Sequence, residues 1–150
     1  MMQPAVRETV TALRDLDGPG LHTPVVMAVR GPKAQALAAE VADTVTFVSS
    51  PGESRAEVEQ MARDFRAIRD AELAVHVSVV GGARAAFMAG PDTDPAALRA
   101  TDSLAYLPDD PAAAAEEIQR RRDEAGFSYF VFGADFAETL APVVAKLAGR

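Results

Sequence analysis

A strand–helix–strand pattern between Pro24 and Val48 constrains the fold of this chain more than any other feature. An apolar run, Val25 to Val29, ends at Arg30-Gly31-Pro32, and a helical segment with apolar residues spaced i, i+3, i+4, i+7 follows. A second β-branched run then covers Thr44 to Val48. Such a crossover is nearly always right-handed and places both strands in one parallel sheet. The sequence therefore predicts an α/β protein.

Further strand and helix patterns follow this unit. Ser54 and Glu57 form a capping-box pattern that predicts the start of a second helix. A third strand is expected over Leu73 to Val80, whose alternation places His76 and Ser78 on the face opposite Leu73, Val75 and Val77. The stretch from Ala83 to Ser103 predicts only short helical pieces between prolines, and Leu104 to Leu107 a short strand.

The C-terminal part shows the same alternation of helix and strand. Asp109-Asp110-Pro111 predicts a helix start, and Gly126 predicts the end of that helix. Phe127 to Phe132 is the last expected strand, and because Pro142 disturbs a helix interior, we expect the final helix to begin near Thr139. The basic run Arg120-Arg121-Arg122 lies among acidic residues and is interpreted as a solvated, salt-bridged helix face.

Size and composition exclude several classes of protein. The chain of 150 residues has about the size of one domain, and we divide it into a lead-in helix and linker (1–23), in which we expect His22 to be merely solvated, and a single α/β domain (24–150). A net charge of −7 argues against nucleic-acid binding. No apolar stretch is long enough for a membrane span, and the N-terminus does not have the pattern of a signal peptide. Together with the lack of cysteine, these features predict a cytoplasmic protein with no thiolate metal site.

The turn after the first strand is the best candidate for a ligand site. Arg30, Gly31 and Lys33 combine two cations with a glycine at a helix N-terminus, whose free N–H groups suit a phosphate. Ser49 and Ser50 follow the second strand and belong to the same carboxyl-terminal rim of the sheet, where parallel α/β proteins bind ligands. We therefore expect these five residues to hold a phosphate group. An ordinary turn with solvated cations remains the alternative.

His76 is the one weak candidate for a catalytic side chain. If the large apolar residues of its strand pack on the helices, His76 points to the other side, where an imidazole can donate a proton or contact a substrate. A hydrogen-bonded core histidine is the alternative. Two distant histidines and no cysteine give no strong metal signal, so no metal site is predicted.

Two stretches resemble the luciferase-like monooxygenase family of flavin- or deazaflavin-dependent barrels. The first is PVVMAVRGPKAQALAAEVADTVTFV, in which Gly31-Pro32-Lys33 and residues 37–43 (LAAEVAD) match the family's pattern. The second is the end of the chain, where Gly126-Phe127-Ser128-Tyr129 and Ala141-Pro142-Val143-Val144 are similar to its last strand and helix. The resemblance covers roughly residues 24–150 and implies strands five to eight of a (β/α)8 barrel, a half-barrel of about four to five parallel strands. A flavodoxin-like doubly wound sheet is the alternative fold.

The resemblance implies a truncated oxidoreductase or monooxygenase that binds FMN or a deazaflavin at the turn of Arg30, Gly31 and Lys33 and acts on a small-molecule substrate. A lone half-barrel leaves sheet edges and an apolar face uncovered, so we expect a homodimer or a complementary half-barrel chain as partner. Family members have glycines where this chain has Ala28-Val29-Arg30. That difference favours the alternative function, a non-catalytic accessory subunit or remnant that pairs with another half-barrel.

Overall fold

Four parallel strands form the main sheet of the computed structural model, which describes residues 2–149. Their order in the sheet is the order of the chain: β1 (Val26–Val29), β2 (Thr44–Phe47), β3 (Glu72–Val77) and β7 (Phe127–Phe132). The predicted α/β class with a parallel sheet is confirmed. The doubly wound alternative is wrong for these strands, because such a sheet needs a point at which the strand order reverses.

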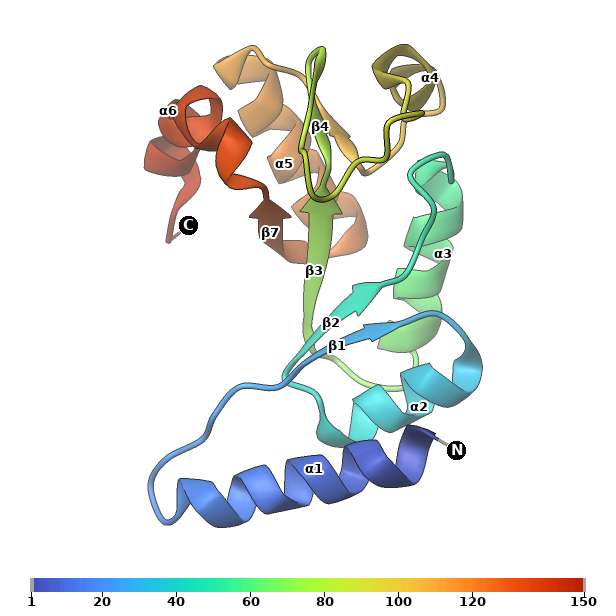
Figure 1. The fold of residues 1–150 in the computed structure, drawn as a ribbon, viewed down its shortest axis with the longest axis vertical. Coiled ribbons are helices and arrows are strands. Elements are labelled where there is room, and N and C mark those ends of the chain that lie inside the picture. The colour runs from blue at the N-terminus through green and yellow to red at the C-terminus, as the bar shows by residue number, and fades with distance from the viewer. Residues whose placement is uncertain (1, 150) are drawn as a thin grey trace.

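Helices connect successive strands of this sheet. In Figure 1, α2 and α3 lie on the same side of β1 and β2, and α1 runs alongside α2 at the lower end of the molecule. The helices are α1 (Met2–Asp17), α2 (Pro32–Val41), α3 (Arg55–Arg66), α4 (Pro95–Ala100), α5 (Pro111–Ala125) and α6 (Ala137–Leu147), with a 3₁₀ turn, η1, at Ala134–Phe136.

The main core fills the space between the strands and the helices. Its aromatic centre is Phe47 of β2, which makes edge-to-face contacts with Phe65 of α3 and Phe127 of β7, at centroid distances of 6.3 and 6.4 Å. Alternate strand residues supply the rest of the buried wall, as the period-2 pattern predicts. A second buried cluster joins β4, α5 and α6 around Phe136 and Leu140.

The other side of the same strands is only partly covered: Thr44 and Ala74 are buried there, but several other residues are exposed. By register and alternation, its residues include Val26, Ala28, Thr46, His76 and Tyr129, which we call the open face. Val26 is 58% exposed and Tyr129 is 49% exposed, although both are large apolar or aromatic side chains. The strands at both ends of the sheet, β1 and β7, pair on one side only among the described strands. Within residues 2–149, the sheet therefore presents a partly uncovered face between two edges that pair with no further strand.

The predicted strand Leu73 to Val80 is divided in two. β3 ends at Val77, and Val79–Val80 forms a separate strand, β4, because the backbone N–H groups of Ser78 and Val79 donate to the carbonyl of Ala105 at 2.9 and 3.0 Å. β4 then pairs with β5 (Ala83–Arg84) and with β6 (Tyr106–Leu107) in a small second sheet. The change of partner separates Ser78 from the regular part of the strand.

One expectation for the C-terminal half is wrong, and the predicted solvated, salt-bridged face holds for its salt bridges but not for the exposure of Arg121. Helix α6 begins at Ala137, two residues before Thr139, and contains Pro142. A proline costs one backbone hydrogen bond, and because Pro142 lies on the exposed side of the helix, water can take the freed carbonyl. Arg121 is not solvated but 1% exposed, the largest fully buried side chain described. The charge pattern of the sequence does not reveal that Arg121 is buried, since the adjacent Arg120 in the same helix is exposed.

The lead-in helix α1 is attached to the domain by ion pairs. Arg7 pairs with Glu40 of α2 at 2.7 Å, and Arg14 pairs with Asp43 at 3.3 Å. His22 is also bonded to Asp43, at 2.7 Å, whereas the sequence predicted a merely solvated histidine. Among residues 2–149, none of the helices combines the length and the apolar character that crossing a membrane requires.

Candidate functional site

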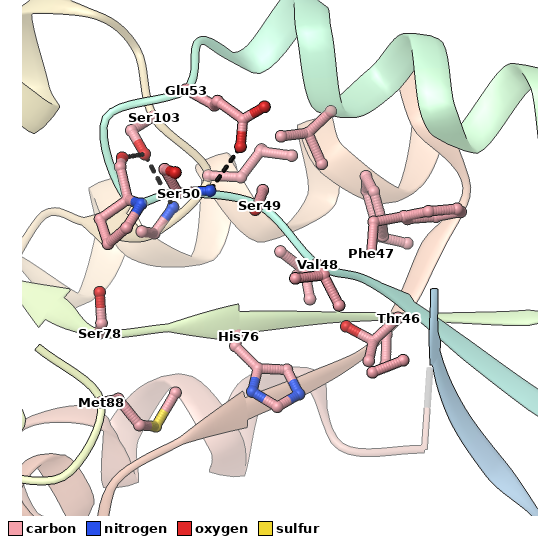
Figure 2. Close-up of a pocket in the computed structure, with 18 residues that line it drawn as sticks. Thr46, Phe47, Val48, Ser49, Ser50, Glu53, His76, Ser78, Met88 and Ser103 are labelled. Carbon is pink, nitrogen blue, oxygen red and sulfur yellow. Dashed lines mark hydrogen bonds between the residues drawn. The ribbon is translucent and has the colours of Figure 1, made fainter. Parts of the chain in front are cut away.

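A cavity of about 290 Å³ opens beside the carboxyl-terminal ends of β2 and β3. Its apolar wall comes from β2, β7 and α3, and includes Phe47, Phe127 and Val58. The loop that follows β2, with Ser49 and Ser50, forms another wall (Figure 2). In parallel α/β folds this rim is the usual place for ligands, because loops with free polar groups meet there.

Serine hydroxyls supply part of the polar surface of the cavity. Ser103 is buried and bridges two loops: its hydroxyl donates to the carbonyl of Pro51 at 2.6 Å and accepts from the N–H of Ala105 at 3.2 Å. Ser78 is 4% exposed, and its hydroxyl has no hydrogen-bond partner within the described residues. Figure 2 shows the Ser78 hydroxyl directed toward the side of Ser50 and Ser103. Leaving a buried hydroxyl without a partner is costly, so Ser78 is available to a bound group or a water molecule.

His76 lies on the open face of β3 and contributes to the cavity. The residue is exposed at its outer side, but the surrounding strand and loop partly desolvate the ring, and this desolvation lowers the pKa of His76. A neutral imidazole is therefore favoured, which can donate one hydrogen bond and accept another. The direction of the side chain matches the alternation of β3, and its chemical role stays a prediction.

Arg30 and Ser50 meet at the carboxylate of Glu53. Arg30 donates to Glu53 through Nη1 at 3.0 Å and through Nη2 at 2.7 Å, and the backbone N–H of Ser50 donates to the same carboxylate. Nη1 of Arg30 also donates to the carbonyl of Val48 at 2.8 Å. The hydrogen bonds from Arg30 hold the pKa of Glu53 below its usual value, so this carboxyl is ionised at neutral pH.

The five predicted phosphate residues are thus divided between two places. Ser49 and Ser50 line the cavity, whereas Arg30, Gly31 and Lys33 do not. Gly31 is the N-cap of α2 with φ −79°, and a Cβ added there meets nothing within 4 Å, so no close approach in the structure demands a glycine. Lys33 lies exposed in the first turn of α2.

Sequence reasoning missed two residues of the site, Glu53 and Ser103. Glu53 directly precedes the N-cap residue Ser54 and is 23 residues away from Arg30, so no local pattern links the two side chains. Ser103 lies in a stretch with no readable pattern, and 52 residues separate it from the carbonyl it contacts, so nothing local identifies it.

Neither a metal-ligating group among the described residues nor a known relative identifies the ligand of the site. Within residues 2–149, no group of three or more histidine, aspartate or glutamate side chains is arranged to hold a metal ion. Comparison of the chain with models of protein families, with curated proteins and with solved structures finds no match. The geometry of the cavity and its rim is therefore the basis on which a function can be inferred.

Proposed function

We propose that the chain is a half-barrel, luciferase-like oxidoreductase or monooxygenase that binds FMN or a deazaflavin. One observation supports this most strongly: the cavity lies at the carboxyl-terminal ends of β2 and β3, next to the turn that holds Arg30. Ligand sites of parallel βα folds are concentrated at this rim. The cofactor supplies hydride or oxygen chemistry when bound, and the chain binds and orients it beside a small-molecule substrate.

The residues present suit the phosphate of such a cofactor. The guanidinium of Arg30 and the N–H of Ser50 already converge on one anionic group, the carboxylate of Glu53. Donors that hold a carboxylate in this way can also hold phosphate oxygens. In the proposal, Arg30, Gly31 and Lys33 contact the phosphate from the β1–α2 turn, and Ser49 and Ser50 contact it from the next loop. His76 faces the substrate side.

The open face supports the proposed pairing of half-barrels. Val26 and Tyr129 are exposed there, and β1 and β7 offer unpaired edges. Proteins usually cover such edges and apolar faces. We propose that a second copy of the chain, or a complementary half-barrel chain, covers them, and that the protein acts in the cytoplasm.

Native mass spectrometry with FMN and with a deazaflavin tests this function. We expect a dimer that takes up one of the two cofactors, and weaker uptake when Arg30 and Lys33 are both replaced by alanine. A monomer that takes up neither cofactor would contradict the proposal. Far-UV circular dichroism of the Arg30→Ala/Lys33→Ala variant checks that the lost uptake is not lost folding.

One observation favours the second candidate, a non-catalytic accessory subunit. Glu53 already neutralises Arg30, so the turn has an internal partner and does not require a phosphate. This function predicts a stable complex with a partner half-barrel, no uptake of either cofactor, and no effect of the Arg30→Ala/Lys33→Ala variant in any ligand assay.

A further inference from the structure

The position that Glu53 occupies has the features of an anion site. Three N–H donors point at its carboxylate, two from the planar guanidinium of Arg30 and one from the backbone of Ser50. A guanidinium fork combined with a backbone N–H is the arrangement that proteins use for phosphate as well as for carboxylate. The carbonyl of Val48 also holds Nη1 of Arg30 at 2.8 Å, which limits the freedom of the guanidinium to turn elsewhere.

Glu53 and Arg30 differ in their access to solvent. The side chain of Arg30 is 56% exposed, whereas that of Glu53 is 17% exposed. A dissolved phosphate can therefore reach Arg30, but it meets the ionised carboxylate of Glu53 beside the same donors. Like charges at this distance repel, and the N–H of Ser50 is already used by Glu53.

We propose that Glu53 is a built-in competitor for the phosphate group, so that this one carboxylate determines the affinity of the Arg30–Ser50 site for anions. A phosphate binds only when the carboxylate of Glu53 leaves the donors. The identity of the phosphate as part of a cofactor rests on the proposed function. The competition between Glu53 and an anion does not depend on that function. The role of Glu53 follows from its position on the donors of a site otherwise made of Arg30 and Ser50.

Titration with inorganic phosphate tests the competition directly. In Glu53→Gln the side chain keeps its size and an acceptor oxygen but loses its charge. We expect this variant to bind phosphate at least fivefold more tightly than the wild type, measured by shifts of the Arg30 and Ser50 amide signals in nitrogen–proton correlation spectra at low salt. Glu53→Ala serves as a second variant with the same expectation.

Two controls assign the gain to this site. Glu116→Gln removes the same charge from an exposed position on α5 and should leave phosphate binding unchanged. Adding Arg30→Ala to Glu53→Gln should abolish the gain, because the main donor is then missing. A gain smaller than fivefold in both Glu53 variants, or a gain that survives Arg30→Ala, would overturn the proposal.

Flavin binding separates this inference from the proposed function. Glu53→Gln should strengthen the binding of FMN but not of riboflavin, which has no phosphate. If Glu53→Gln gains affinity for inorganic phosphate while neither protein binds FMN or a deazaflavin, the proposed function fails and the competition stands. If the wild type binds FMN and Glu53→Gln binds FMN and phosphate no better, the competition fails and the proposed function stands.

Discussion

Two arginine–glutamate groups in this protein are chemically alike but lie in opposite environments. In the first, Arg121 of α5 is buried and donates to Glu117 at 2.6 Å and to the carbonyl of Leu104 at 2.8 Å. In the second, Arg30 and Glu53 lie at the rim of the cavity, with Arg30 more than half exposed. Burial makes the loss of one partner of the first group costly, while exposure leaves the second able to exchange partners.

The buried group extends over several elements. Arg55 of α3 pairs with Asp102 at 2.8 Å and also with Glu117, so that α3, α5 and the segment before β6 are joined through charged side chains. Burial alone would raise the pKa of Glu117, but the charges of Arg121 and Arg55 outweigh it and the pKa lies below its usual value. The pKa of Glu53 is lowered chiefly by its hydrogen bonds with Arg30, at the exposed rim of the cavity.

Arg121→Ala should give the largest effect. It leaves the backbone carbonyls of Leu104 and Tyr106 without this donor and removes one of the cationic partners of Glu117, so we expect a loss of about 3–5 kcal/mol in the free energy of unfolding. Urea denaturation followed by circular dichroism measures it. The neighbouring Arg120→Ala is the matched control and should cost less than about 1 kcal/mol, because Arg120 is exposed. Equal losses in the two variants would show that burial does not distinguish Arg121 from Arg120 energetically.

Acid should weaken the buried group more than the rim pair. The folded pKa values of Glu117 and Glu53 both lie below the pKa of an unfolded glutamate, which is about 4.3. The stabilisation that each carboxylate gives is therefore complete above that pH and is lost as the pH falls through the folded pKa. Denaturation at neutral pH and at about pH 3 should show less acid dependence in Glu117→Gln than in Glu53→Gln. If Glu53→Gln shows less acid dependence than Glu117→Gln, the carboxylate of Glu53 interacts more strongly with its partners than that of Glu117 does.

A double-mutant cycle on Arg30 and Glu53 should give a small coupling. Since Arg30 is largely exposed, we expect about 0.2–1 kcal/mol at low salt, and less as salt is added. The variants Arg30→Ala, Glu53→Gln and their combination complete the cycle by urea denaturation. A coupling well above this range would show that Glu53 belongs to the structure as firmly as Glu117 does.

Arg7→Ala should have the smallest effect. The pair of Arg7 with Glu40 joins α1 to α2, and both side chains are exposed. We expect a change within about 0.5 kcal/mol. A larger loss would show that α1 contributes to the stability of the domain through this pair.

Most of the repeating part of the fold was predictable from sequence. The runs that became β1, β2 and β7, the capping box of Ser54 and Glu57, and the helix end at Gly126 all depend on neighbours within a few residues. Gly126 has φ 81°, a conformation that glycine adopts without strain. These local rules also put Ser49 and Ser50 at the correct rim, because every parallel strand ends at the same edge of the sheet.

The candidate site was only partly predictable. Arg30 was identified, but its partner Glu53 was not, since a charge pattern does not say which cation a carboxylate will reach. The unpartnered hydroxyl of Ser78 also depends on tertiary structure: β3 ends one residue earlier, where the carbonyl of Ala105 takes over the hydrogen bonds. Residues separated by tens of positions decide both features.

By itself, the sequence determined a parallel βα chain with a polar rim, because hydrophobic periodicity and capping act over short distances. Only the tertiary structure decided which charges are buried. Arg120 and Arg121 are identical and adjacent, but successive residues of a helix point in different directions, so one faces solvent and the other enters the core. In the same way, the fold brought Arg30 to Glu53 across 23 positions, although the contact of Glu53 with the N–H of Ser50 is local.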